Sequence, residues 1–141
     1  MKNDMRAFTL VELVIVIIVV AILSIVAVAS YRSYVAKAVL SEAKTLMNAV
    51  EKQEVIYHQA YGYYHAVPEA VSYDPDLDIN VASNKYFTSF KVITSDNDHA
   101  TAITQGADIA TNVSLTLEFY DVDKKPRWIQ NDTANNWTMT E

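Results

Sequence analysis

The fold of this chain is decided by one apolar stretch near its N-terminus, which begins Phe8-Thr9-Leu10-Val11-Glu12-Leu13-Val14-Ile15-Val16-Ile17 and continues to Ala29. From Leu10 to Ala29 the stretch has 20 residues and one charged side chain, Glu12. A helix rises about 1.5 Å per residue, so these residues span roughly 30 Å, the thickness of the hydrocarbon core of a bilayer. The sequence therefore predicts a helix that is long and apolar enough to cross a membrane.

Two simple interpretations explain only part of this stretch. A cleaved secretory signal has an apolar run of about 7–15 residues, and this run is longer. A plain single-pass anchor fits the length but leaves Glu12 unexplained, because a carboxylate in hydrocarbon costs on the order of 2–3 kcal/mol. Lys2 and Arg6 precede the stretch. Because positive charge stays in the cytoplasm, we expect the N-terminus to face inward and the bulk of the chain to face outward.

The residues from Ala7 to Ile17 resemble the class III signal of type IV pilins and pseudopilins. The resemblance implies that a prepilin peptidase cuts between Ala7 and Phe8 on the cytoplasmic side and N-methylates the new Phe8 amine. The apolar run is then kept. The resemblance also implies that Phe8, Thr9 and Glu12 act in the assembly of a helical homopolymer.

The chain departs from the pattern of that family at three points. Ala7 stands where the family usually has Gly, and because Ala is also small we still expect cleavage. Ala21 and Ala29 stand where the family commonly has Gly and Pro. Ala is the better helix former, so the family's partial unwinding of this segment is not expected here. The chain also has no cysteine, whereas most pilins have a disulfide in the C-terminal region.

The electrostatic cost of buried charge favours an assembly role for Glu12. Cleavage before Phe8 creates a positively charged amine, and an unpaired amine or carboxylate is costly inside an apolar filament core. If Glu12 of one subunit pairs with the Phe8 amine of a neighbour, both costs are relieved and the axial register is fixed. The alternative is that Glu12 snorkels to the membrane interface.

Beyond the apolar stretch the helical pattern continues but becomes amphipathic. Apolar residues recur near a spacing of 3.6, at Val35, Val39, Ala43, Leu46, Val50 and Tyr57. No glycine occurs before Gly62, so we predict one helix over about 8–61 that ends at Gly62. Its first half, 8–31, is the membrane span and later the filament core. Its second half, 32–61, packs under a small domain.

The remaining residues predict a small antiparallel sheet. Residues 62–85 contain several turn formers, including Pro68 and Pro75, and are interpreted as a connecting loop. Strand-like runs follow at 86–93, 99–104, 113–119 and 127–129, with a turn at 123–126 before the last run. In the run 113–119 apolar and polar residues alternate, so we expect Val113, Leu115, Leu117 and Phe119 to face inward. We therefore predict an α+β fold in which the long helix packs on three to four antiparallel strands. The head and tail occupy 86–141, and residues 1–7 form a cleaved leader.

The sequence favours neither an enzyme nor a cofactor. The absence of cysteine excludes a thiol nucleophile and an iron–sulfur site, and the Ser, His and Asp residues form no nucleophile motif. A net charge of −6 argues against a nucleic-acid partner, because an anionic surface repels phosphates.

The sequence also predicts no metal site. Oxygen ligands alternate, as at the start of a calcium loop, at Asp74, Asp76, Asp78 and Asn80. Ile79 replaces the turn glycine and Lys85 replaces the bidentate glutamate of such a loop, so we expect a solvated acidic loop. No metal-ligand spacing relates His58, His65 and His99, which we expect to be surface residues.

The resemblance implies a structural subunit, the major pilin of a type IV pilus that serves adhesion and twitching motility. Its partners would be copies of itself, the prepilin peptidase, the assembly platform with its ATPase, and the inner membrane before assembly. The expected location is the inner membrane for the precursor and the extracellular filament afterwards. The alternatives are a periplasmic pseudopilin of type II secretion and a minor or DNA-uptake pilin.

Overall fold

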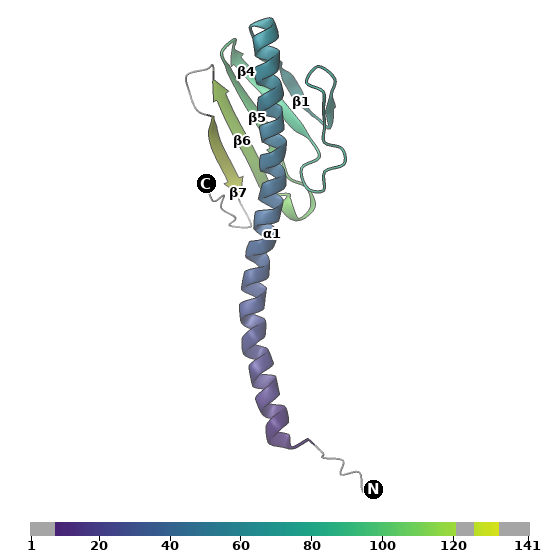
Figure 1. Ribbon diagram of the computed structural model, residues 1–141, viewed down its shortest axis with the longest axis vertical. Helices are drawn as coiled ribbons and strands as arrows, with labels where there is room; N and C mark the ends of the chain where they lie inside the picture. The colour runs from purple at the N-terminus through teal and green to yellow at the C-terminus, as the bar shows by residue number, and fades with distance from the viewer. Residues whose placement is uncertain (1–7, 121–125, 133–141) are drawn as a thin grey trace. The chain divides into compact units, whose positions relative to one another are not determined.

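The structure is a computed structural model that describes residues 8–120 and 126–132 (Figure 1). Within those ranges it contains the helix α1 (Leu10–Tyr61), the short 3₁₀ helix η1 (Asp108–Ala110), and the strands β1 (Val67–Val71), β2 (Tyr73–Asp74), β3 (Ile79–Asn80), β4 (Phe90–Asp96), β5 (His99–Gln105), β6 (Val113–Tyr120) and β7 (Arg127–Asp132). Contacts divide the chain into two compact units, one ending at Val35 and one beginning at Ala36.

The long helix is confirmed, and so is its end. Gly62 follows the last helical residue, Tyr61, with a φ of +79°. This left-handed conformation costs glycine little, and it lets the Gly62 N–H donate to the carbonyl oxygen of His58 at 2.8 Å. The start differs slightly from the prediction, because α1 begins at Leu10 rather than Phe8.

The main sheet of the second unit has five antiparallel strands in the order β1-β4-β5-β6-β7. The last four strands form the meander that the sequence predicted, so the α+β fold is confirmed. In β6 the alternation is as predicted, since Val113, Leu115, Leu117 and Phe119 are buried and the residues between them are half-buried. The predicted turn at 123–126 lies largely outside the described residues.

The core of this unit lies between the second half of α1 and one face of the sheet, which the helix crosses in Figure 1. The apolar stripe of the helix supplies the buried residues Val39, Leu40, Ala43, Leu46, Met47 and Val50. The sheet supplies Phe90, Val92, Ala100, Ala102, Leu115 and Leu117. The apolar residues that recur at helical spacing in α1 and at alternate positions in the strands thus pack together in one core.

The segment 62–85 is not only a loop, which corrects the prediction. It contains β1 at the edge of the main sheet and the two-stranded β2-β3 sheet. Pro68 lies within β1, and proline is tolerated there because an edge strand has one unpaired side. The pairing with β4 is irregular, since Val67 pairs with Val92 while Val71 pairs with Phe90. The sequence pattern missed this strand because a proline argues against a strand unless the strand is known to be an edge.

The expected strand over 86–93 begins later, at Phe90, because Glu42 of α1 takes hydrogen bonds from the preceding backbone. The Glu42 carboxylate accepts the N–H of Tyr86 at 2.7 Å, of Phe87 at 2.9 Å and of Lys85 at 3.3 Å. These N–H groups therefore do not enter a β-ladder. Phe87 is fully buried beside this contact. The Glu42 carboxylate therefore holds residues 85–87, which lead into β4, against α1.

We predict that Glu42→Ala lowers the free energy of unfolding of the second unit by about 2–4 kcal/mol, because it leaves partly buried N–H groups without their charged acceptor. Denaturant unfolding of the detergent-solubilised chain, followed by tryptophan fluorescence, measures the change. The matched control is Glu69→Ala, which removes an exposed glutamate of β1 and should change stability by less than about 0.5 kcal/mol. Equal losses for both variants would contradict the role given to Glu42.

Candidate functional site

The first turn of α1 is closed by Thr9 and Glu12. The Thr9 N–H donates to Glu12 Oε2 at 2.9 Å, and the Thr9 hydroxyl donates to the same oxygen at 2.8 Å. In return, the Glu12 N–H donates to the Thr9 hydroxyl at 3.3 Å. This reciprocal pair is a capping box, with Thr9 as N-cap and Glu12 at the third helical position. It explains why the helix begins at Leu10.

The capping box leaves Glu12 with capacity for a further donor. Both contacts that its carboxylate accepts from Thr9 use Oε2, and Glu12 is exposed. Phe8, the predicted new N-terminus, is 78% exposed and directly precedes the cap. The cleavage site itself includes Ala7, which lies outside the described residues. The structure thus brings Phe8, Thr9 and Glu12 to one end of the helix.

The first unit exposes apolar side chains on every side of α1. The exposed residues include Leu10, Leu13, Ile15, Ile17, Ile18, Ile22, Leu23 and Ile25. A helix that is apolar all round needs an apolar environment on all sides, which is a membrane or other protein. By length and composition, α1 is sufficient to cross a membrane.

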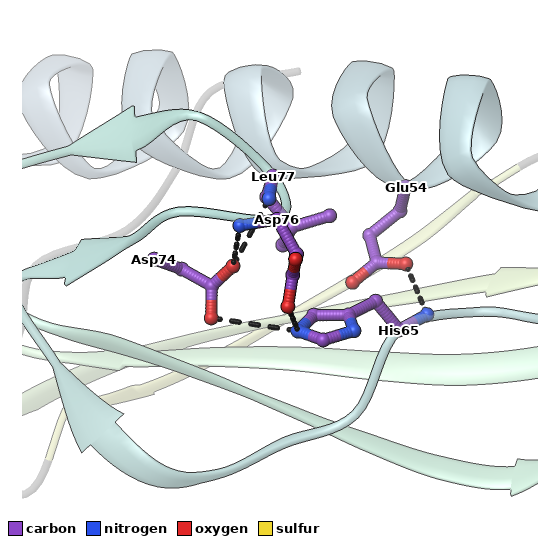
Figure 2. Close-up of polar contacts among 5 residues, drawn as sticks. All are labelled: Glu54, His65, Asp74, Asp76 and Leu77. Carbon is purple, nitrogen blue, oxygen red and sulfur yellow. Dashed lines mark hydrogen bonds and ion pairs between the residues drawn. The ribbon is translucent and has the colours of Figure 1, made fainter.

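The second unit contains a polar cluster that the sequence pattern did not predict (Figure 2). His65 Nε2 lies 3.5 Å from Asp74 Oδ2 and 3.6 Å from Asp76 Oδ2. The Asp74 side chain is held in place because its Oδ1 accepts the N–H groups of Asp76 and Leu77, each at 3.0 Å. We call His65, Asp74 and Asp76 the His-Asp cluster.

Glu54 of α1 borders the His-Asp cluster. Its side chain is fully buried, and its Oε2 accepts the N–H of His65 at 2.8 Å. Its Oε1 is buried and has no hydrogen-bond partner within the described part of the chain. Burial raises the pKa of the Glu54 carboxyl to about 7; the bond from His65 lowers this pKa, and the charge of Asp74 raises it.

The weak calcium candidates do not come together as a calcium loop. Asp74 and Asp76 join His65, whereas Asp78 lies outside the cluster and the Asn80 side-chain oxygen accepts the N–H of Ala82 at 3.1 Å. Asp74 is buried, so the expectation of a wholly solvated acidic loop is wrong at that position. His65 is half-buried, and the sequence carries no signal for its encounter with Asp74 because a turn and a strand separate them.

Comparison with known proteins gave a match for the N-terminal part of the chain. No curated protein matches the chain at a significant level. Residues 2–31 match the model of the prokaryotic N-terminal methylation motif, and this range contains the capping box and the apolar stretch. The match, together with the long helix packed on an antiparallel sheet, supports the assignment of this chain to the family of type IV pilins and pseudopilins.

Proposed function

We propose that the chain is the major pilin of a type IV pilus, a structural subunit that polymerises through the first half of α1. The observation that carries the proposal is the apolar surface from Leu10 to Val28, which residues 8–120 and 126–132 leave exposed. In the precursor this surface faces lipid, and in the filament it faces the same segment of neighbouring subunits. The second unit forms the filament surface, where it serves adhesion and motility.

In this account Glu12 sets the register between subunits. Prepilin peptidase cuts between Ala7 and Phe8 and methylates the Phe8 amine. The new amine is positively charged, and Glu12 of a neighbouring subunit is the one carboxylate in the apolar stretch. Because Oε2 closes the capping box, Oε1 is the oxygen that meets the neighbour's amine. Burial in the filament core strengthens this pair, since a low dielectric raises the cost of leaving either charge alone.

Two other family roles share this machinery. A pseudopilin of type II secretion would assemble through the same segment into a short periplasmic fibre. A DNA-uptake pilin would need a surface that attracts phosphates, and the net charge of −6 argues against it. The acidic Glu12 favours a subunit that is added repeatedly along a fibre, which both the major pilin and the pseudopilin require.

We predict that Glu12→Gln is processed normally but assembles at least about tenfold less filament. Glutamine can still close the capping box, so the variant removes the charge and keeps the helix start. N-terminal sequencing measures cleavage before Phe8, and quantification of sheared surface filaments measures assembly. Glu69→Gln, which removes an exposed charge in β1, is the control and should assemble like the natural chain. Normal filament yield from Glu12→Gln would refute the pairing.

We also predict that α1 stays continuous in the filament. The helix is unbroken from Leu10 to Tyr61, and the positions where the family commonly loosens it hold Ala21 and Ala29. A filament map at side-chain resolution should show helical density throughout 21–29. The comparison variant Ala29→Pro should open the preceding turn, because proline removes an N–H and clashes with the carbonyl four residues earlier. A melted segment in the natural filament would show that assembly forces outweigh helix propensity.

A further inference from the structure

The His-Asp cluster has the donor spacing of a metal site. Its three ligand atoms lie within 4.8 Å of one another, and the two nitrogen–oxygen distances are 3.5 and 3.6 Å. Two ligands bound at about 2.1 Å to a tetrahedral ion lie about 3.4 Å apart. Both nitrogen–oxygen separations are close to this value, and the two carboxylates, whose ligand atoms lie within 4.8 Å of each other, would have to close to about the same separation around one ion.

The ligands are held by contacts that do not use the metal-facing atoms. Asp74 uses Oδ1 to close the β2-β3 turn, which directs Oδ2 toward His65. The His65 backbone is tied to α1 through Glu54, and the Tyr57 ring lies 5.0 Å from the His65 ring. Such supporting bonds orient metal ligands in known sites and raise their affinity.

Glu54 provides an independent indication that a cation belongs here. Its buried Oε1 has no hydrogen-bond partner in the described residues, although burying a carboxylate oxygen without a partner is costly. Figure 2 shows this oxygen on the side of the carboxylate that faces the His65 ring and Asp76. Two carboxylates thus contact the His65 imidazole and a third accepts the His65 backbone N–H, and a divalent cation would offset the repulsion between Glu54 and Asp74.

We propose that His65, Asp74 and Asp76 bind a divalent transition-metal ion, best matched by Zn²⁺, and that Glu54 Oε1 faces the bound ion. The donor set identifies the class of metal, because one imidazole with carboxylates suits zinc and its neighbours. Calcium prefers six to eight oxygen ligands, and Asp78 and Asn80 do not converge on the cluster. The proposal revises the expectation of no metal site and does not depend on the assembly role of the first unit.

The bound ion would link three parts of the second unit: the end of α1 through Glu54, the segment before β1 through His65, and the β2-β3 turn through both aspartates. A ligand that binds the folded state and not the unfolded state raises stability by mass action. The chain has no cysteine and therefore no disulfide to make such a link. The bound metal would therefore stabilise the folded second unit as a disulfide cross-link does in other small domains.

The test is a zinc titration of the full chain in detergent micelles after treatment with a chelator. Isothermal titration calorimetry should give one Zn²⁺ per chain, and the thermal midpoint of the second unit should rise by several degrees with ZnCl₂. His65→Gln and Asp76→Asn should each weaken zinc binding at least about tenfold and abolish the midpoint shift. Asp76 has an exposed side chain and only its backbone is used in the turn, so Asp76→Asn should fold normally.

Two matched controls separate the cluster from other ligands. Asp78→Asn removes the same charge from the same turn, and His58→Gln removes an imidazole outside the cluster; both should bind zinc like the natural chain. The proposal is overturned if the natural chain binds no Zn²⁺, in which case the cluster is an ion pair of His65 with two aspartates. It is equally overturned if His65→Gln and Asp76→Asn keep full affinity, or if Ca²⁺ binds more tightly than Zn²⁺ and Asp78→Asn abolishes that binding.

Discussion

The uncovered apolar surface of the first half of α1 is the constraint on which the rest of this protein depends. Full burial of one large aliphatic side chain is worth about 1.5–3 kcal/mol, so this surface represents on the order of tens of kcal/mol. The residues that the structure describes do not supply that burial, so it has to come from lipid or from other protein. The proposed function provides this burial in two states, a membrane precursor and a helical polymer, with processing at Phe8 between them.

A charged carboxylate within such an apolar surface is costly, so its presence at Glu12 needs an explanation. Within the isolated chain Glu12 closes a capping box with Thr9, which is a structural role of its own. That role needs only an acceptor, which glutamine would also supply, so it does not account for the charge. The proposed pairing with a neighbour's amine would account for the charge. The two roles are compatible because a carboxylate has two oxygens.

The sequence predicted those features that depend on local patterns. The length of α1, its end at Gly62 and the alternation along β6 follow from spacing and from the conformational freedom of one glycine. The missed features depend on partners distant in sequence. Glu42 lies 44 residues from Tyr86, and it delays the start of β4 by taking the N–H groups that precede it. β1 was missed because Pro68 argues against a strand unless the strand is known to be an edge.

In the candidate sites, too, the sequence predicted the groups that are local in sequence and missed the group that the fold assembles. Phe8, Thr9 and Glu12 lie within five consecutive residues, so their grouping could be predicted from the sequence. The His-Asp cluster could not be predicted in this way. Its geometry depends on two contacts between separate segments: Glu54 of α1 holds the His65 backbone, and the β2-β3 turn places Asp74 and Asp76 beside the His65 ring. The alternating acidic run resembled the start of a calcium loop, yet only its members Asp74 and Asp76 lie in the cluster, and His65 from outside the run completes it.

The most direct test of the assembly account is electron microscopy of material sheared from the cell surface, combined with mass spectrometry of the N-terminus of its main protein. We expect abundant thin filaments built from this chain, each subunit beginning at an N-methylated Phe8. A processed chain that remains in the cell envelope, with no surface filaments, would contradict the major-pilin role and favour a pseudopilin.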